Sequence, residues 1–427
     1  MERQITANQG SIKTEDKNVL VIGKLGVEDF HRLLAAIHDR VQEHGYTEVV
    51  LDFSDCTATF AGPMLAVCAQ TIDLRREGID ISLVLPKKEN LERLFVNTNW
   101  ARMIDPVRHE ASRFKGFSQV PVTHFSSASD QHKAVNAIMD AMLKSLTDLS
   151  RGDLAAIEWS VNEITDNVIN HSNSQTGGLV QLTTFKKEQH RVEYAVCDAG
   201  IGIPNSLRQT YPEITSDSDA LDKAIREGVT RDKTIGMGNG LFGSFEICRV
   251  SEGYFEVHSG YARLSQNKQK GLHIRLENVP YSGTLVVACV DYSKRGVLQE
   301  ALRFGNKNHL PVRDYIEAAH ESDDGARIVF VMNKEAESFG TRVAGRPVKI
   351  KLQNLASLCP TQKVFIDFSD VPVISSSFAD EVLGKLFLEL GPLAFMQRFE
   401  VVNTTDAVSG LIDRAIGQRA AKGRIED

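Results

Sequence analysis

The sequence predicts a multidomain protein of the α/β and α+β classes, with a central domain between two smaller, related α/β units. The chain of 427 residues is too long for a single compact core, so several domains are expected. The phrase LDFSDCTATFAGP at 51–63 is nearly repeated as IDFSDVPVISSSF at 366–378. Between these copies, from 130 to about 292, helical and strand-like segments alternate again.

The first α/β unit is expected to alternate strands with helices. Strands are predicted by three short runs rich in Val, Ile and Leu, at 18–25, 47–53 and 80–86. Helices are predicted by apolar residues at helical spacing in 28–45, 63–78 and 90–104. The first two helices should stop at Gly45 and Gly78, since glycine readily adopts the left-handed conformation that ends helices.

The same order of elements is predicted around the second copy. Strands are expected at 326–333, 363–368 and 399–403, and helices at 379–391 and 407–416. With a register shift of two residues, the apolar positions of the last helices also correspond: Leu91, Leu94 and Phe95 fall opposite Val408, Leu411 and Ile412. We interpret the two units as an internal duplication separated by a large insert, although 334–362 matches the helix at 28–45 poorly.

The composition and net charge of the chain limit the classes of binding partner that are expected. The net charge of −7 argues against nucleic acid or an anionic membrane as the main partner. The basic stretch 294–309 is the best local exception, with a solvated helix face as the alternative. No apolar run approaches the roughly 20 residues of a membrane span, and the N-terminus lacks a signal-peptide pattern. The six cysteines have no metal-binding spacing, so we expect a cytoplasmic protein with reduced thiols.

A candidate site begins on the helix predicted at 155–172. One apolar stripe of this helix contains Ile157, Val161, Ile164 and Val168. A second stripe, roughly 100° around the axis, contains Glu163, Asn167, Asn170 and His171. Asn and His are not favoured in helices, so a role beyond helix propensity is indicated for this stripe. The alternative is an ordinary solvent-facing surface.

Three glycine-containing segments follow this helix. In RVEYAVCDAGIGIP, at 191–204, a strand brings Asp198 to a turn where Gly200 and Gly202 leave the backbone open to a ligand. In GMGNGLFGSFEI, at 236–247, three glycines precede a helix, and backbone N–H groups at a helix start favour phosphate. The third segment begins a strand with Gly283 and Thr284. The glycine-rich segment is neither a P-loop nor a dinucleotide fingerprint, and each motif alone is weak.

The order and spacing of these four elements resemble the GHKL ATPase superfamily of gyrases, heat-shock chaperones, histidine kinases and MutL-type proteins. The resemblance covers about 130–292 and implies a central α/β sandwich of the Bergerat type that binds ATP and Mg²⁺. It implies that Glu163 is the catalytic residue, which orients or deprotonates water or a hydroxyl acceptor, and that Asn167 supplies an oxygen to Mg²⁺. Asp198 would receive the adenine amino group, and Thr284 would hold the other side of the ring. The other implied nucleotide contacts are Gly200, Gly202, Gly236, Gly238, Gly240 and Leu241.

The segment 216–235 is expected to form a lid over the nucleotide phosphates. Its candidate phosphate contacts are Arg226, Arg231 and Lys233. Ordinary surface charge is the alternative role for each of these three side chains.

The flanking units resemble STAS domains, the fold of anti-sigma-factor antagonists, in which a serine at a loop-to-helix junction is phosphorylated. Aligned on Asp52 and Asp367, the junction reads Phe60-Ala61-Gly62-Pro63 in the first copy and Ser375-Ser376-Ser377-Phe378 in the second. The first copy therefore lacks the hydroxyl, and Ser376 is the candidate phosphoacceptor of the second copy. The second copy also lacks the Asp and Gly that flank the serine in that family. Helix capping is the alternative role of these serines.

These resemblances imply five segments along the chain. They are a STAS-like domain without the phosphoacceptor at 1–112, a linker at 113–129, the GHKL domain at 130–292, a helical linker at 293–324 and a second STAS-like domain at 325–427. The implied function is that of a Mg·ATP-binding regulatory protein related to the anti-sigma-type serine kinases of partner-switching circuits. The STAS-like units would then be docking or substrate domains for protein partners.

Other functions stay open at this point. One is an ATP-hydrolysing conformational clamp, which would associate as a homo-oligomer, and another is a scaffold that does not phosphorylate protein. A two-component histidine kinase is disfavoured, because no His-Asp or His-Glu pair lies in a long helix before the GHKL segment. His132, for example, is followed by Lys133.

Overall fold

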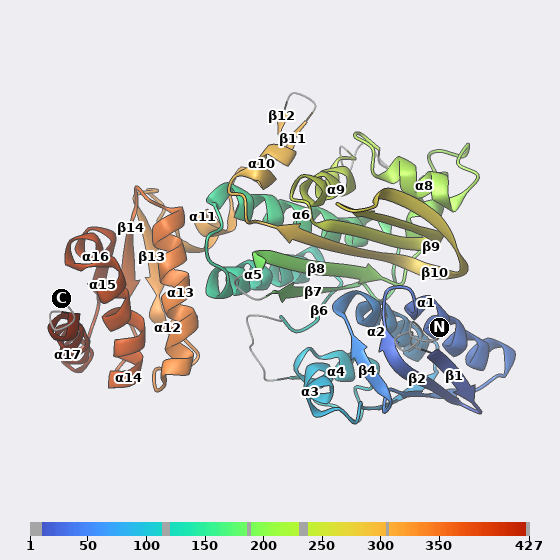
Figure 1. The fold of residues 1–427 in the computed structure, drawn as a ribbon, viewed down its shortest axis with the longest axis horizontal. Coiled ribbons are helices and arrows are strands. Elements are labelled where there is room, and N and C mark those ends of the chain that lie inside the picture. Colours follow the sequence, from blue (N-terminus) through green and yellow to red (C-terminus); the bar gives the residue numbers. More distant parts are fainter. Residues whose placement is uncertain (1–10, 113–119, 186–188, 230–237, 305–306, 424–427) are drawn as a thin grey trace, which may run out of the picture. The chain divides into compact units, whose positions relative to one another are not determined.

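The computed structural model describes residues 11–112, 120–185, 189–229, 238–304 and 307–423 (Figure 1). The chain is a multidomain protein of mixed α/β type and divides into two compact units. Unit 1 consists of residues 1–138 and 159–309, and unit 2 consists of residues 139–158 and 310–427. Unit 1 therefore contains the first copy of the repeated phrase and most of the central region, and unit 2 contains the second copy.

The N-terminal part of unit 1 is an α/β layer with a mainly parallel sheet in the order β1-β2-β3-β5. Strands β2, β3 and β5 are parallel, β1 pairs with β2 as an antiparallel neighbour, and β4 joins the other end of β2. The strands are β1 Ser11–Glu15, β2 Asn18–Leu25, β3 Glu48–Asp52, β4 Cys56–Thr59 and β5 Asp80–Val84. The helices are α1 Phe30–His38, continued by a π-helical turn Asp39–Glu43, α2 Ala61–Arg76, α3 Glu89–Asn97 and α4 Trp100–Ile104.

The strands and first two helices predicted here are confirmed, whereas the single helix predicted at 90–104 is wrong. The chain leaves the helical conformation at Asn99, whose φ of 66° lies in the left-handed region. Asparagine tolerates this conformation better than most residues. The Asn99 side-chain oxygen also accepts a hydrogen bond from the backbone N–H of Ser112 at 2.7 Å, which helps hold the break between α3 and α4.

The central part of unit 1 is an antiparallel sheet in the order β6-β7-β8-β10-β9. The strands are β6 Thr123–Phe125, β7 Gly178–Thr184, β8 Arg191–Asp198, β9 Tyr254–Asn267 and β10 Gly271–Asp291. The helices are α5 Ala128–Ser145, α6 Arg151–His171, α7 Gly202–Arg208, α8 Asp217–Ala224 and α9 Gly240–Val250, and the parts of α5 and α6 within 139–158 belong to unit 2. After the sheet come α10 Val297–Ala301 and a short hairpin of β11 Arg303–Phe304 and β12 Lys307–Asn308.

Strand β8 shows how the two parts of unit 1 share one core. Successive side chains of a strand point to opposite faces. Ala195 and Cys197 belong to the core cluster that contains the apolar residues of α2, whereas Val196 and Asp198 line a cavity on the helical side. Helix α2 thus covers one face of the central sheet, as Figure 1 shows.

Gly62 explains why the first copy of the repeated phrase has a small residue at this point. A Cβ atom at Gly62 would lie only 2.8 Å from Cγ2 of Val287 on β10, so the start of α2 approaches the central sheet too closely for a larger residue. Further along α2, the side-chain amide of Gln70 donates to the carbonyl oxygen of Ser282 at 2.7 Å. Apolar packing and this hydrogen bond together attach the first copy to the central sheet.

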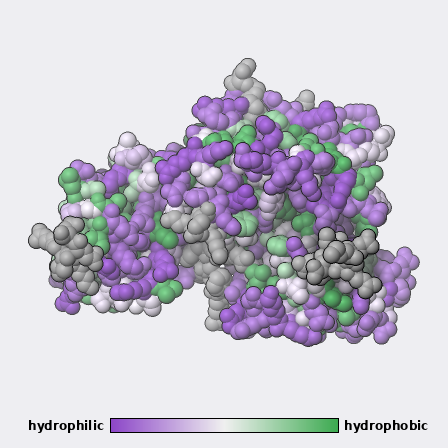
Figure 2. All heavy atoms as spheres, in the orientation of Figure 1, coloured by the Kyte–Doolittle hydropathy of each residue, from purple (hydrophilic) through white to green (hydrophobic). Residues whose placement is uncertain are grey.

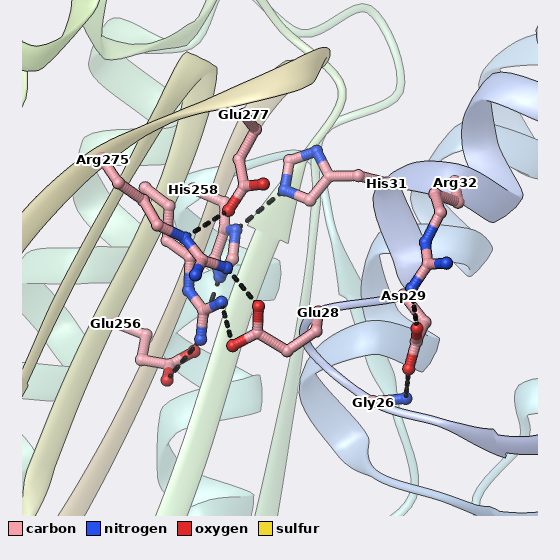
Figure 3. Close-up of polar contacts among 10 residues, drawn as sticks. Gly26, Glu28, Asp29, His31, Arg32, Glu256, His258, Arg275 and Glu277 are labelled. Carbon is pink, nitrogen blue, oxygen red and sulfur yellow. Dashed lines mark hydrogen bonds and ion pairs between the residues drawn. The ribbon is translucent and has the colours of Figure 1, made fainter. Parts of the chain in front are cut away.

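Helix α1 makes a second, polar attachment to the same sheet (Figure 3). Nδ1 of His31 donates to the carbonyl oxygen of Val279 at 3.1 Å, so Nε2 of His31 accepts from Nδ1 of His258 at 2.9 Å. Glu28 forms ion pairs with Arg263, at 2.5 Å, and with Arg275. Burial first, and then the neighbouring His258, lower the pKa of His31 to about 3, so the His31 imidazole is neutral at physiological pH.

Unit 2 has a parallel sheet in the order β13-β14-β15. The strands are β13 Arg327–Val331, β14 Lys363–Asp367 and β15 Phe399–Val402. The helices are α11 Tyr315–His320, α12 Met332–Glu335, α13 Arg342–Leu358, α14 Ser376–Ala379, a π-helical turn Asp380–Gly384, α15 Lys385–Leu390, α16 Pro392–Arg398 and α17 Asp406–Gly423. The fully buried Lys351 of α13 pairs with Asp140 at 2.6 Å and with Glu335 at 2.8 Å.

The two copies have the same backbone order of parallel strand, helix, parallel strand, helix, parallel strand and helix. Helix α13 lies where the sequence comparison found no good match, and it takes the position that α1 has in the first copy. Asp52 and Asp367 make the same turn, since each carboxylate accepts from a backbone N–H two residues on, in each case at 2.8 Å. Phe60 and Ser375 are the equivalent N-cap residues of α2 and α14. The predicted alignment of the repeated phrases is therefore confirmed.

The surface is largely hydrophilic on the face drawn in Figure 2, where apolar side chains form small separate areas. Within the described ranges, no helix combines the length and the apolar character needed to cross a membrane.

Candidate functional site

Helix α6 carries the first two residues of the predicted site. Glu163 and Asn167 are one helical turn apart, so their side chains leave the helix on the same side. Neither side chain has a hydrogen-bond partner among the residues that the structure describes, and both line one cavity. Behind them, the Ser160 hydroxyl bonds to Tyr194 of β8 and, at 2.7 Å, to Ser244 of α9. This buried polar cluster holds α6 in place against the sheet and α9.

The end of strand β8 places Asp198 at the base of the same cavity. Asp198 is only 2% exposed, and its Oδ1 accepts from the backbone N–H of Gly200 at 2.7 Å. Thr284 of β10 lies directly opposite Asp198 in the ladder, and its hydroxyl is 3.3 Å from that of Ser259. A buried carboxylate and a hydroxyl therefore stand side by side, an arrangement that can bind a planar polar group with both donors and acceptors.

Glycines bring the backbone close to this carboxylate. A Cβ atom at Gly200 would collide with the carbonyl oxygen of Ser172, and one at Gly283 would collide with that of Asp198. Gly202 has a φ of 76°, and its own Cβ would lie 2.7 Å from the Ser259 hydroxyl. These positions must be glycine for the turn after β8 to fold against β10.

The N-terminus of α9 closes another side of the cavity. A Cβ atom at Gly240 would collide with the carboxylate of Glu163, so glycine allows this helix start to lie against Glu163. The first backbone N–H groups of a helix have no carbonyl partner within the helix and attract anions. Gly238, with a φ of 73°, turns the chain just before the helix. The N-terminus of α9, Glu163 and Asn167 thus surround one end of the cavity.

Most of the predicted site residues meet in this cavity of about 150 Å³. Those that line it are Glu163, Asn167, Asp198, Gly202, Gly238, Gly240, Leu241 and Thr284. Gly200 does not line it but supports Asp198 from behind. Gly236, Arg231 and Lys233 lie outside the described residues. Arg226 is described, but it forms an ion pair with Asp222 on the surface and does not line the cavity.

Several residues that line the cavity were not predicted from the sequence. Three are polar: Asp166, Ser172 and Ser206. The apolar ones are Val196, Ile203, Leu207, Ala224, Val229 and Val286. Val196 and Val286 could have been found, because they share the strand face of Asp198 and Thr284 by simple alternation. Ala224 and Val229 lie in the segment 216–235 that was predicted to form a lid, but which of its residues line the cavity depends on the tertiary path of the segment.

Burial changes the acid strength of both carboxyl groups in the cavity. Burial, and then repulsion by Asp166, raise the pKa of Glu163 to about 7. Burial raises the pKa of Asp198 to about 7 as well, against the opposing effect of hydrogen bonds from the backbone N–H groups of Gly200 and Thr284. A carboxyl group with a pKa near neutrality can accept and release a proton at physiological pH, which general acid–base catalysis requires.

The cavity does not contain a complete set of protein ligands for a metal ion. Among the described residues, no group of three or more His, Cys, Asp and Glu side chains could hold one. Mg²⁺ commonly takes only one or two protein oxygens and completes its shell with water and substrate phosphates. The single amide oxygen of Asn167 fits this pattern of Mg²⁺ binding. It does not fit a permanently bound structural metal, which needs several ligands from the protein.

The junction that contains Ser376 belongs to unit 2. Ser375, not Ser376, caps the helix, because its hydroxyl accepts from the backbone N–H of Phe378 at 3.0 Å. The capping role weighed for these serines is therefore confirmed for Ser375. Ser376 is the first residue of α14 and is exposed. Its hydroxyl has no hydrogen-bond partner within the described ranges.

Comparison with known protein families supports one part of this picture. A family model described as a STAS-like domain of unknown function (DUF4325) matches residues 345–409. Residues 345–409 are STAS-like. The matched range begins within α13, ends within α17 and includes the serine junction at 375–377. No curated protein matches the chain.

Proposed function

We propose that this protein is a Mg·ATP-binding regulatory protein of the GHKL type, related to the anti-sigma-type serine kinases, with STAS-like units as docking or substrate domains. One observation carries the proposal: residues from four separate segments of the chain line a single cavity in the arrangement that the resemblance implies. Glu163 and Asn167 come from α6, Asp198 from β8, the glycines from the start of α9, and Thr284 from β10.

The base of the cavity suits adenine. The ionised carboxylate of Asp198 is only an acceptor, so it can bind the amino group of adenine but not the carbonyl oxygen that guanine carries at the same position. Asp198 is held in one orientation by the Gly200 N–H, and the neighbouring Thr284 hydroxyl can both donate and accept. Val196 and Val286 supply apolar surface beside these groups. This combination of apolar walls and few polar groups is typical of small-molecule sites.

The other end of the cavity suits phosphates. The N-terminus of α9 would bind phosphate oxygens through its free N–H groups, and the Asn167 amide oxygen would be a ligand of Mg²⁺. The bound ion would neutralise phosphate charge. Glu163 would accept the proton of an attacking hydroxyl or water at its carboxylate, and its raised pKa suits this role.

The STAS-like units fit a regulatory role in different ways. In the first copy, Ala61, Gly62 and Pro63 are buried and carry no hydroxyl, so this junction is structural. In unit 2, Ser376 is exposed at the start of a helix, where an added phosphate would be tolerated electrostatically. We therefore propose Ser376 as the acceptor, in the same chain or in a second copy, and the STAS-like surface of unit 2 as the docking site for a protein partner.

The kinase activity is tested by phosphate transfer from γ-labelled ATP. The proposal predicts label on the wild-type chain, loss of label in Ser376→Ala, and loss in Glu163→Ala with retained ATP binding. Ser375→Ala is the matched control, because it removes the adjacent hydroxyl and should keep the label. If the chain binds ATP but no labelled phosphate is transferred to protein, the proposed kinase activity is contradicted. Release of free phosphate in that case would favour the conformational clamp.

A further inference from the structure

Unit 1 contains a second and larger cavity, of about 560 Å³, on the opposite face of the central sheet from the nucleotide cavity. It lies where α2 begins, between the first copy of the repeated phrase and the sheet. Thr59, Phe60 and Ala61 line it from the first copy, and Arg191, Glu193 and Asp291 are among the residues that line it from the sheet. Its volume is in the range of ligand pockets, about 300–1,000 Å³.

Strand alternation explains how the cavity arises. Glu193, Ala195 and Cys197 of β8 point to the same face of the sheet. The core of α2 covers Ala195 and Cys197, whereas Glu193 lies beyond the N-terminus of α2 and lines the cavity instead. Aromatic side chains complete the walls, with Trp100 from α4 and Tyr254 from β9. The cavity is therefore a gap in the packing between the first copy and the sheet.

The charges around the cavity leave one carboxylate without a cation. Arg191 pairs with Asp291 at 3.3 Å, and these two charges cancel. Outside the cavity, the neighbouring Glu256 pairs with Arg263 at 3.1 Å. Glu193 is only 8% exposed and accepts a hydrogen bond from the Tyr254 hydroxyl, but no Lys, Arg or His among the described residues forms an ion pair with it. A buried carboxylate without a cation is costly, and a positively charged ligand would relieve that cost.

Thr59 supplies a second observation of the same kind. This residue is 6% exposed and lines the cavity at the end of β4, yet its Oγ1 has no hydrogen-bond partner among the described residues. Buried hydroxyls in proteins are nearly always hydrogen-bonded. A ligand could therefore supply a cation to Glu193 and a hydrogen-bond partner to Thr59.

We infer that this cavity is a second ligand site, which binds a small organic amine with an apolar body. The ammonium group would pair with the Glu193 carboxylate, a polar atom of the ligand would bond to the Thr59 hydroxyl, and the apolar body would lie against Trp100 and Tyr254. Electron-rich aromatic faces also favour a nearby cation. A carboxylic acid of the same shape would be repelled by Glu193.

The probes are phenethylamine and 3-phenylpropionate, which have similar size and opposite charge, titrated calorimetrically into the full chain. We expect phenethylamine to bind one site per chain and 3-phenylpropionate not to bind. Glu193→Gln should weaken phenethylamine binding about tenfold or more, and Thr59→Val, which replaces only the hydroxyl, about threefold. Glu246→Gln removes a carboxylate of α9 that lies elsewhere in unit 1 and pairs with Arg249, and it should leave phenethylamine binding unchanged.

The outcomes separate this site from the nucleotide site. Asp198→Asn should leave phenethylamine binding unchanged, and saturating ATP should not displace the amine. Absence of binding of phenethylamine to the wild type would overturn the inference. Equal binding of both probes, or binding that Glu193→Gln leaves intact, would also overturn it and would mark Glu193 as a protonated structural residue. Thermal unfolding of each variant confirms that the loss of binding is not a loss of fold.

Discussion

The two copies of the repeated phrase have the same backbone path, but the loop-to-helix junction is buried in the first copy and partly exposed in the second. In the first copy, Ala61, Gly62 and Pro63 are buried because the start of α2 packs on the central sheet. In the second copy, Ser375 caps the helix at the equivalent junction, and Ser376, the first residue of the helix, is exposed. The same loop-to-helix turn thus packs against the central sheet in unit 1, whereas in unit 2 it exposes a serine hydroxyl to solvent. The difference shows that the same backbone turn can pack against a neighbouring sheet or face solvent, depending on the residues that it carries.

The largest effect on stability is expected from a larger side chain at Gly62, where α2 of the first copy lies close to the central sheet. Gly62→Val should lower the free energy of unfolding by about 3 kcal/mol, since its side chain would overlap Val287. Ser377→Val, at the equivalent position of the second copy, should cost less than about 1 kcal/mol. Urea denaturation of both variants measures the two values. Equal losses would mean that the two junctions do not differ in packing as described.

A smaller effect is expected from the carboxyl group that the first copy helps to bury. Burial, and then the nearby Glu256, raise the pKa of Glu193 from 4.5 to about 7. The folded state therefore binds more protons than the unfolded state in this window, and Glu193 makes the free energy of unfolding fall as pH rises from about 4.5 to about 7. Glu193→Gln should remove this contribution and be more stable than the wild type by about 2 kcal/mol above pH 7.

Denaturation curves at pH 5 and pH 8 provide the check. The difference in stability between Glu193→Gln and the wild type should be larger at pH 8. A difference that does not depend on pH would show that Glu193 titrates normally and that the first copy does not bury it effectively.

In the second copy, loss of the helix cap should have an intermediate effect. Ser375→Ala removes the acceptor of the Phe378 N–H and should cost about 1 kcal/mol. Ser376→Ala should change stability by less than about 0.3 kcal/mol, since the exposed hydroxyl has no hydrogen bond within the described part of the chain. Thermal unfolding distinguishes the two. If Ser376→Ala were the more damaging, Ser376 would be the structural residue of the pair.

The smallest effect is expected from a negative charge at Ser376. Ser376→Asp places a carboxylate in the first turn of a helix, where the helix dipole should stabilise it by about 0.5 kcal/mol at low salt. The gain should diminish in 1 M salt because exposed charges are screened. A loss greater than about 1 kcal/mol would argue that unit 2 does not tolerate a phosphate at this position.

The sequence allowed much of the fold to be predicted, because strands and helices follow from local periodicity. Alternation in β8 and the glycine stops at Gly45 and Gly78 are local signals of this kind. Helix α13 was missed because Gly345 and Pro347 lie within it and disfavour a helix. The break at Asn99 was missed because Asn99 lies within a run of apolar spacing that suggests one continuous helix.

For the candidate site, the sequence predicted the residues with distinctive chemistry and missed those defined by tertiary packing. Glu163, Asp198 and Thr284 could be identified from motifs, and the structure brings them into one cavity. The role of Gly62 and the burial of Glu193 could not, because both depend on α2 packing against a sheet more than 100 residues away in the chain. Contacts of this kind leave no local pattern in the sequence.

The most direct test of the central claim is calorimetric titration of ATP into the full chain, with and without Mg²⁺. We predict one site per chain, tighter binding with Mg²⁺, and a loss of about tenfold or more in Asp198→Asn, whose carboxamide can present its donor side to the adenine amino group. Asp367→Asn is the matched control, because this aspartate also ends a strand but lies in the STAS-like unit, and it should bind ATP as the wild type does. A wild-type chain that binds no ATP would contradict the nucleotide site and the function proposed from it.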